Sequence, residues 1–380
     1  MVHRTLRAPA LGLALVVSLS SLAACGSSDD GSGRTPAADA SASASTSSAD
    51  RTDARFFADS SPWNTRVDTL PTDPQSGRMI GLAAQRVGVV ETGGVLRTQE
   101  ISVDDPLYIN TEAWTTPVVS GGVPTSVVCR QIVCGDGDDE ITLDIPDDVD
   151  PDPRYDGWFT VFDAAHHVAY DLWRARREDD GSISYHYMKK WDLDGPGFGA
   201  PQEVSARGSG LPLFAGLIRP DELENGLIDH ALAISLPGPA AGSFVSPASS
   251  TDGNGDASSI PEGARIRLKA DAIIAPARDP RTGELIKMTA QQRRMADAIV
   301  AALRTYGAIV VDRATVPTLY AQRDVTSGLI NGNELQGLHL WDFEVVDLGE
   351  RFEYPAHDDA ATDASTSSAD TTTATGRSSQ

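Results

Sequence analysis

The residues of this sequence best suited to chemistry are a histidine, an arginine and a tyrosine. His230 lies in an otherwise apolar run. β-Elimination of an acidic polysaccharide requires a cation beside the uronate carboxylate, a base for the ring proton and an acid for the leaving oxygen. Arg265 or Arg174 can supply the cation, and His230 with Tyr187 or Tyr185 can supply the base and the acid. His230 can equally be a buried, hydrogen-bonded structural histidine.

Glycoside hydrolysis is the other polysaccharide chemistry to consider, and it needs two facing carboxyl groups. The chain holds 54 acidic residues, and their spacing singles out no pair. The sequence contains no metalloprotease helix motif, P-loop, dinucleotide-binding glycine fingerprint or nucleophile elbow. It therefore leaves open whether the protein is an enzyme.

A second group of residues suits binding. Within a predicted strand at residues 182–191, Tyr185, Tyr187, Lys189 and Trp191 fall on one face, because side chains alternate along a strand. Aromatic rings beside a cation suit the apolar side of a sugar ring and its hydroxyls. The alternative is that the rings belong to the core. The predicted binding face also includes Trp173 and Arg174.

One segment has the ligand spacing of a calcium loop. Asp252, Asn254 and Asp256 occupy its first, third and fifth positions. An EF-hand would need glycine at the sixth position and glutamate at the twelfth, where this chain has Ala257 and Gly263. A looser calcium site and a plain Asp/Asn/Gly turn remain as interpretations. No other cofactor is predicted.

Two cysteines are spaced to form a disulfide. Cys129 and Cys134 are separated by four residues, and export would place them in an oxidising compartment. A metal pair would need further Cys or His ligands nearby, and the neighbouring sequence has none. We expect a Cys129–Cys134 disulfide that fixes a tight turn.

The N-terminus has the pattern of an export signal. A basic stretch at residues 1–7 precedes an apolar stretch at 8–24 that is too short for a stable membrane span. The apolar stretch ends Leu-Ala-Ala-Cys at 22–25, which resembles the bacterial lipobox. The resemblance implies a signal peptide at 1–24, a lipidated Cys25, and attachment to the outer leaflet of the cell membrane at the cell surface. The alternative is an ordinary signal peptide, which would also export the protein.

Low-complexity segments flank the rest of the chain. Residues 25–55 are mostly Ser, Ala, Asp, Gly and Thr, and residues 356–380 have the same composition. Such segments bury too little apolar surface to offset chain entropy, so a disordered linker and a disordered tail are predicted. Residues 56–355 then form a single β-rich domain.

The charge of the chain limits its partners. It has 31 basic and 54 acidic residues, a net charge of −23. This balance argues against nucleic acid and against a polyanion held by bulk electrostatics. An acidic sugar held locally by a few arginines remains compatible with it.

Short apolar runs separated by Gly, Pro and Asp predict a mainly β fold, a jelly-roll-like β-sandwich with one or two peripheral helices. Three adjacent runs at residues 156–191 have the spacing of a meander. The clearest helix is predicted at 289–306, where Thr289 and Gln292 form a capping box and Gly307 ends the helix. Shorter helices are predicted at 74–86 and 220–225.

Several stretches resemble a group of uncharacterised exported actinobacterial proteins. The resemblance rests on SPWN at 61–64, WRARR at 173–177, GLPLFAGLI at 210–218, IDHAL at 228–232 and IPEGARIRL at 260–268. It implies a single domain and export, and it transfers no catalytic residue.

These observations lead to a functional hypothesis. The sequence predicts a membrane-anchored lipoprotein that binds a glycan or cell-wall polymer through its aromatic and basic face. The first alternative is a polysaccharide-degrading enzyme on the same fold. The second is a structural envelope protein without a small ligand.

Overall fold

A computed structural model describes residues 55–355 of the protein, apart from 93–94, 138–139 and 280. The described residues all belong to one compact unit, Ser48–Gln380. The predicted signal peptide, Cys25, nearly all of the linker and the predicted tail lie outside the described residues. In the part of the chain that is described, no helix is both long enough and apolar enough to cross a membrane.

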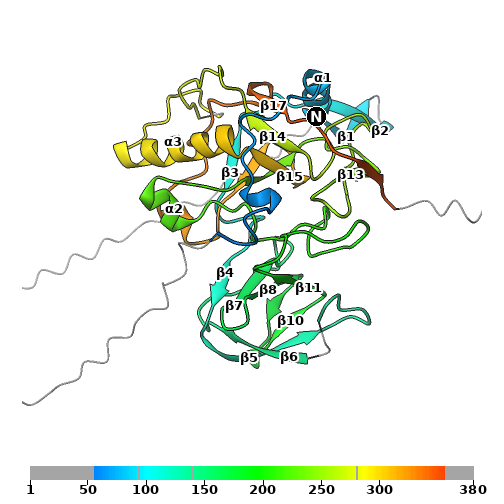
Figure 1. Ribbon diagram of the computed structural model, residues 1–380, viewed down its shortest axis with the longest axis vertical. Coiled ribbons are helices and arrows are strands. Elements are labelled where there is room, and N and C mark those ends of the chain that lie inside the picture. Colours follow the sequence, from blue (N-terminus) through cyan, green and yellow to red (C-terminus); the bar gives the residue numbers. More distant parts are fainter. Residues whose placement is uncertain (1–54, 93–94, 138–139, 280, 356–380) are drawn as a thin grey trace, which may run out of the picture. The chain divides into compact units, whose positions relative to one another are not determined.

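The largest sheet has six strands of mixed direction (Figure 1). Its central strand β12 is buried at all five positions, because it pairs on both sides with β15 and β16. Such strands have the near-continuous apolar sequence seen in LAISL. In sheet order the strands are β17 (Phe343–Val345), β14 (Arg265–Leu268), β15 (Ala308–Arg313), β12 (Leu232–Leu236), β16 (Thr318–Tyr320) and β3 (Tyr108–Asn110).

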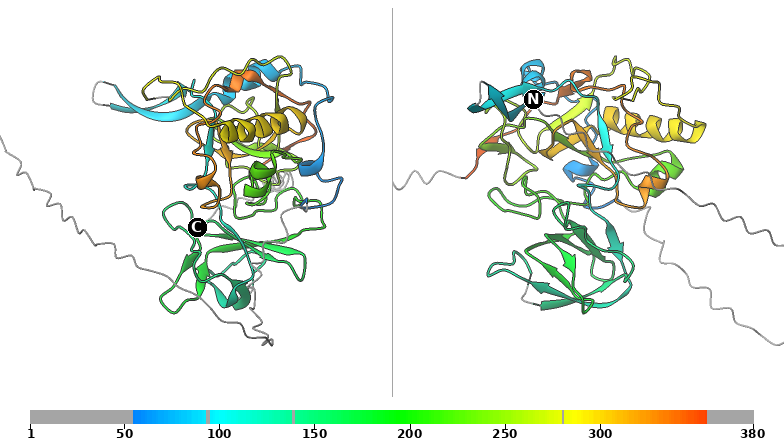
Figure 2. Two further views of the ribbon diagram at one scale, coloured as in Figure 1. Left: turned by 90° about the vertical axis from the view of Figure 1, so that its left-hand side faces the viewer. Right: turned by 180° about the vertical axis from the view of Figure 1, so that it is seen from behind.

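The long helix α3 (Ala290–Thr305) packs against this sheet (Figure 2). The predicted capping box is present, because Thr289 Oγ1 accepts from the amide of Gln292 and Gln292 Oε1 accepts from the amide of Thr289. Gly307 follows the helix with φ of +66°, a conformation that favours glycine. The shorter helices are α1 (Ser76–Ala83) and α2 (Pro220–Asn225), close to their predicted positions.

Two four-stranded sheets pack as a small β-sandwich. Phe159 and Leu172 of one sheet share a core with Val127, Ile145 and Ile183 of the other. The first sheet is β11 (Tyr187–Asp192), β8 (Val168–Trp173), β7 (Phe159–Asp163) and β4 (Val118–Ser120), and the second is β6 (Glu140–Ile145), β5 (Val123–Cys129), β10 (Ile183–Tyr185) and β9 (Arg176–Arg177). The predicted mainly β, sandwich-like fold with few helices is confirmed.

The remaining elements are short. Two further antiparallel pairs and three 3-10 helices complete the described part of the chain. They are β1 (Gln85–Thr92) with β2 (Val95–Ser102), β13 (Ser243–Val245) with β18 (Arg351–Glu353), and η1 (Pro62–Asn64), η2 (Thr326–Gly328) and η3 (Leu340–Asp342).

The prediction of one strand at residues 182–191 is wrong. The chain forms β10 and β11, which belong to different sheets of the sandwich, and it crosses between them at His186. Alternation within a strand does not continue through such a crossing. The ring of Tyr185 therefore lies in the core between the sheets, apart from the face of β11 that carries Tyr187.

The predicted disulfide is confirmed. Cys129 and Cys134 are bonded, with Cα atoms 5.9 Å apart. The bond closes a turn after β5. The carbonyl of Cys134 accepts from the amide of Met188 at 2.9 Å, so this turn is joined to β11.

Asp171 of β8 is the most heavily bonded buried acid of the sandwich. Its side chain has no exposed surface and accepts from Thr160 Oγ1 at 2.6 Å, Trp191 Nε1 at 2.8 Å and the amide of Leu213 at 2.7 Å. It therefore connects three strands to the loop that precedes α2. Burial raises the pKa of Asp171 to about 6, although the three hydrogen bonds favour the ionised form and lower it.

Two substitutions at Asp171 should differ sharply in stability. Asp171→Ala leaves three buried donors without an acceptor and should lower the free energy of unfolding by about 3 kcal/mol or more. Asp171→Asn keeps one oxygen for Trp191 and Leu213, and its amide can donate to Thr160, whose hydroxyl can turn toward Thr116 at 3.3 Å. It should cost less than half as much. Urea unfolding at pH 7 measures both.

The pH dependence of stability gives a second readout on Asp171. Its ordinary pKa is 3.8, so between about pH 4 and pH 6 the folded protein keeps a proton that the unfolded chain has released. The resulting stabilisation is complete below pH 4 and is lost as the pH rises through 6. The unfolding free energy of the wild type minus that of Asp171→Asn should fall by on the order of 3 kcal/mol from pH 4 to pH 7. A constant difference would contradict this account.

Candidate functional site

A cleft of about 650 Å³ runs along one edge of the six-stranded sheet. Strand β15 ends at this edge, and β16 and β3 begin there, because both run opposite to β12 and β15. Both aromatic and charged side chains line the cleft. They include Tyr108, Asn110, Trp114, Asp156, Trp158, Asp252, Asn254, Asp312, Arg313, Tyr320 and Arg86.

Three carboxyl groups meet at the wall of the cleft. Oxygen atoms of Asp252, Glu262 and Asp312 all lie within 4.8 Å of one another. Asp312 is near the end of β15, Glu262 lies just before β14, and Asp252 lies in the loop after β13. Asp252 and Asp312 line the cleft, whereas Glu262 has no exposed surface.

Two arginines approach this carboxyl cluster, which consists of Asp252, Glu262 and Asp312. Arg313 Nε lies 3.0 Å from Asp252 Oδ2. Arg207 is buried between two rings, 5.0 Å from that of Trp158 and 5.1 Å from that of Tyr320, and its Nε is 3.8 Å from Asp312 Oδ2. Two guanidinium groups therefore approach a cluster of three carboxyl groups.

The electrostatics of the carboxyl cluster follow from burial. Burial and then the charge of Asp252 raise the pKa of Asp312 to about 7 and that of Glu262 well above its usual range. Burial, reinforced by Asp312, also raises the pKa of Tyr320, whose hydroxyl bonds to that of Ser235. Groups perturbed in this way beside an open cleft are typical of functional sites.

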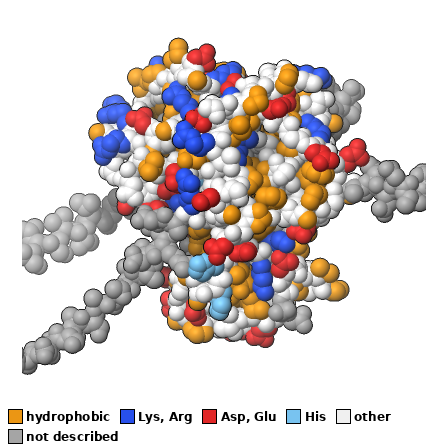
Figure 3. Space-filling model, in the orientation of Figure 1, with side chains coloured by type: hydrophobic (Ala, Val, Ile, Leu, Met, Phe, Trp, Pro, Cys, Tyr) orange, Lys and Arg blue, Asp and Glu red, His pale blue; other side chains and the backbone are white. Residues whose placement is uncertain are grey.

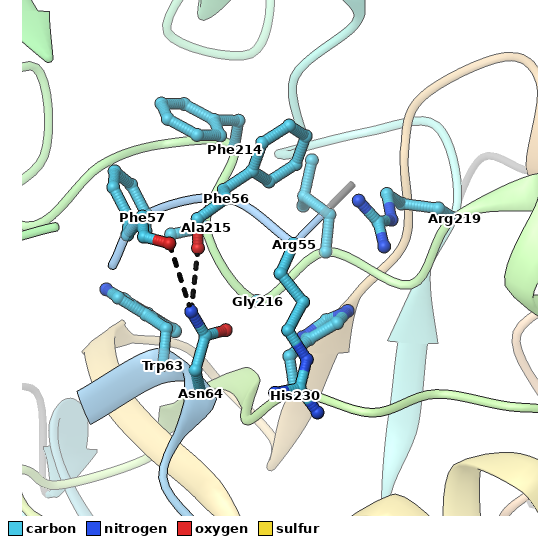
Figure 4. Close-up of a pocket in the computed structure, with 11 residues that line it drawn as sticks. Arg55, Phe56, Phe57, Trp63, Asn64, Phe214, Ala215, Gly216, Arg219 and His230 are labelled. Atoms are coloured by element: carbon cyan, nitrogen blue, oxygen red, sulfur yellow. Dashed lines mark hydrogen bonds between the residues drawn. The ribbon is translucent and has the colours of Figure 1, made fainter. Parts of the chain in front are cut away.

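His230 lies elsewhere, beside a cavity of about 20 Å³, roughly the room for one water molecule (Figure 4). Its Nε2 is 2.8 Å from Glu222 Oε1, and its Nδ1 is 2.9 Å from the carbonyl of Ala231. Arg219 bonds the same Glu222 oxygen at 2.6 Å. This arrangement favours the structural interpretation of His230.

The other two residues of the β-elimination hypothesis do not join His230. Arg265 donates to backbone carbonyls, that of Tyr306 at 2.5 Å and that of Pro62, and burial lowers its pKa to about 9. Tyr187 lines a different, shallow pocket and donates to the carbonyl of Val204 at 3.3 Å. His230, Arg265 and Tyr187 therefore form no common site in the described structure.

Most side chains of the predicted binding face already contact other residues of the protein. Trp191 is buried and bonds Asp171, and Lys189 pairs with Asp136 at 3.1 Å and with Glu203 at 3.5 Å. Tyr187 and Trp173 are half-buried and share the shallow pocket. Arg174 is exposed and stacks 4.6 Å from the Trp173 ring. With Tyr185 in the core, the open aromatic face is reduced to two rings.

The predicted calcium loop does not bring its three oxygen ligands together. Asp252 belongs to the carboxyl cluster and Asn254 lines the cleft. Asp256 instead accepts from the amide of Ser258 at 2.7 Å, as expected for a plain turn. Of the three predicted ligands, only Asp252 lies close to acidic side chains from outside the loop pattern.

Sequence reasoning missed Glu262, Asp312 and Arg207. One signal for Asp312 was present, because it follows the apolar run AIVV, and ligands of α/β sheets often bind at the carboxyl ends of buried strands. The surface offers little further guidance. On the face shown in Figure 3, basic side chains occur in small groups with acidic and apolar ones between them.

Comparison with known proteins adds no relative. No protein-family model, no curated protein and no solved structure matches the chain.

Replacing His230 tests its structural role. His230 and Glu222 are both largely buried. Burial opposes the ionisation of Glu222, but His230 and Arg219 outweigh it and hold the pKa of Glu222 down at about 2. His230→Ala should lower the unfolding free energy by about 2–3 kcal/mol at pH 7 and leave ligand binding in the cleft unchanged.

A matched control is available next to His230. Asp229 pairs with Arg55 at 2.9 Å in a half-exposed position, so Asp229→Asn should cost less than about 1 kcal/mol. Thermal or urea unfolding compares the two variants. If His230→Ala were as stable as the wild type, or abolished binding in the cleft, the structural assignment would fail.

Proposed function

We propose that the protein is an exported glycan-binding protein whose ligand occupies the cleft beside the carboxyl cluster. The observation that carries this proposal is the combination of tryptophan and tyrosine rings with charged side chains in one large open cavity. Ligand sites are typically concave, with apolar walls and a few polar groups that fix orientation. The proposed binding surface is therefore at the edge of the six-stranded sheet and not on β11, where the sequence predicted it.

The aromatic residues of the cleft are suited to sugar rings. Trp114 is 47% exposed and meets Tyr155 edge to face, with ring centres 5.5 Å apart. Trp158 is only 6% exposed and stacks on Arg207, so it supports the wall of the cleft and does not offer an open ring face. The C–H face of a pyranose can pack on the exposed ring of Trp114.

Polar side chains of the cleft supply the hydrogen bonds that a glycan needs. Asn110 at the end of β3 offers both a donor and an acceptor. Arg313 provides a charged donor and Asp156 provides an acceptor. The guanidinium group of Arg313 can also bind the carboxylate of an acidic sugar bidentately. This mixture allows neutral and acidic glycans to bind despite the negative charge of the whole chain.

Cleavage of the glycan is a second candidate function, favoured by one observation. Asp252 and Asp312 both line the cleft, with oxygen atoms within 4.8 Å. Retaining glycosidases hold two carboxyl groups about 5–5.5 Å apart, and inverting enzymes hold them about 6.5–9.5 Å apart. The spacing is therefore nearer to that of a retaining hydrolase.

The location proposed for the protein rests on its N-terminus. A basic stretch, a short apolar stretch and Cys25 together match a lipoprotein signal. Acyl chains on Cys25 would hold the protein at the outer face of the cell membrane, where glycans and cell-wall polymers are accessible.

Binding can be measured by titrating residues 26–380 with soluble cell-wall glycan fragments and uronate oligomers in a calorimeter. Trp114→Ala should weaken binding by about tenfold, since one aromatic contact contributes about 1–1.5 kcal/mol. Trp341→Ala is the matched control, because Trp341 is also 48% exposed but stacks on His339 outside the cleft. It should bind as the wild type does.

Incubating the protein with the same glycans distinguishes binding from cleavage and from a structural role. Chromatography of the glycans after incubation shows whether products form, and their loss in Asp312→Asn would favour hydrolysis. Equal binding by Trp114→Ala and the wild type would remove the cleft as the binding site. A folded protein that binds none of the glycans would favour a structural envelope role.

Lipidation has its own test. In cells fed an alkynyl palmitate analogue, the wild-type chain should carry the label and sediment with membranes. Cys25→Ala should lose the label and leave the membrane fraction, because residue 25 can then no longer carry the acyl chains. Unchanged labelling of Cys25→Ala would contradict the assignment of the lipidated residue.

A further inference from the structure

We propose that Asp252, Glu262 and Asp312 bind a divalent cation of the calcium type. This inference concerns a site that the calcium-loop pattern in the sequence did not identify, and it does not depend on glycan binding. Asp252 and Glu262 lie ten residues apart in the long loop between β13 and β14, and Asp312 lies in β15. The fold itself, rather than one local loop, brings them together.

The spacing of the carboxylates fits a cation placed between them. Their oxygens lie within 4.8 Å of one another, and Ca²⁺ binds oxygen at about 2.3–2.6 Å, so opposite ligands are up to about 5 Å apart. Mg²⁺ binds at about 2.0–2.1 Å and needs a tighter octahedral set. All three ligands are hard oxygen donors, which suits Ca²⁺ better than Zn²⁺.

A second observation points to a missing partner. Glu262 has no exposed surface; its Oε2 accepts from the amide of Asp252 at 3.2 Å, and its carboxyl group also interacts with the side chains of Thr251 and Asp252. Among the described residues no donor of ordinary geometry reaches its Oε1. A buried carboxylate oxygen without a partner is costly, so a bound cation would remove a specific energetic defect.

The nearby arginines do not remove this defect. Arg313 is bonded to Asp252, and Arg207 is fixed between two rings with its Nε unbonded and 3.8 Å from Asp312. Neither forms an ion pair with Glu262. Glu262 is therefore the member of the carboxyl cluster that no guanidinium pairs with.

The surroundings allow a cation to enter and be held. Asp252 and Asp312 face the cleft, so the cation can reach them from solvent and complete its coordination with water. Gly208 packs against Asp252, and a Cβ on Gly208 would come within 2.4 Å of the carboxyl carbon. The Asp252 carboxylate is thus confined from the protein side and open toward the cleft.

Terbium luminescence and calcium calorimetry test the proposal on residues 26–380, after removal of metal with a chelator. Tb³⁺ should bind at one saturable site and be sensitised by Trp158, which also lines the cleft. Ca²⁺ should displace it, and Mg²⁺ should do so at least about tenfold less effectively. Ca²⁺ should also raise the thermal unfolding temperature, because it binds the folded state.

Matched variants locate the site. Glu262→Gln and Asp312→Asn should each weaken Ca²⁺ binding by at least about tenfold and abolish the thermal shift. Asp256→Asn, from the same loop as Asp252 but outside the carboxyl cluster, should bind as the wild type does. Circular dichroism confirms that each variant is folded, and two cluster variants are used so that one misfolded protein does not decide the result.

Three results would overturn the proposal. One is a folded wild-type chain that binds neither Tb³⁺ nor Ca²⁺. Another is unchanged Ca²⁺ affinity in a folded Glu262→Gln or Asp312→Asn. The third is loss of binding in Asp256→Asn alone, which would place the cation in the turn at residues 252–256.

Discussion

The cleft depends on one interaction, the stacking of the buried Arg207 guanidinium between two aromatic rings. The guanidinium lies between the ring of Trp158, just before β7 of the sandwich, and that of Tyr320, on β16 of the six-stranded sheet. Its Nε faces Asp312 at 3.8 Å. A planar cation can stack on two rings and still partly balance a buried acid, whereas a lysine could not. The cleft forms where these elements meet.

A buried charge of this kind stabilises a fold only if it is fully compensated. Arg207 and Arg313 balance two of the three acids, and Glu262 is left without a cation. Replacing such groups by apolar side chains is often stabilising, so their presence is better explained by function than by stability. Asp171 illustrates the contrasting case, because three donors satisfy it while it joins the sandwich to the loop that precedes α2.

Local patterns predicted the local structure well. The apolar run of β12, the capping box at Thr289 and the disulfide at Cys129 depend on neighbours in sequence, and each is present. The strand at residues 182–191 failed because alternation cannot reveal that a chain changes sheets. The carboxyl cluster was not predictable either, since Asp252 and Glu262 are 10 residues apart in one loop, and Asp312, 50 residues further on, comes close through the pairing of β15 with β14.

The central claim is that the carboxyl cluster beside the cleft is the functional centre and holds a cation. X-ray diffraction from crystals soaked in Tb³⁺ tests it most directly, because anomalous scattering locates the ion independently of any assay. The account predicts one strong peak within about 2.6 Å of oxygens from Asp252, Glu262 and Asp312. An ordered carboxyl cluster without a peak, or a peak confined to exposed acids such as Asp136, would contradict it.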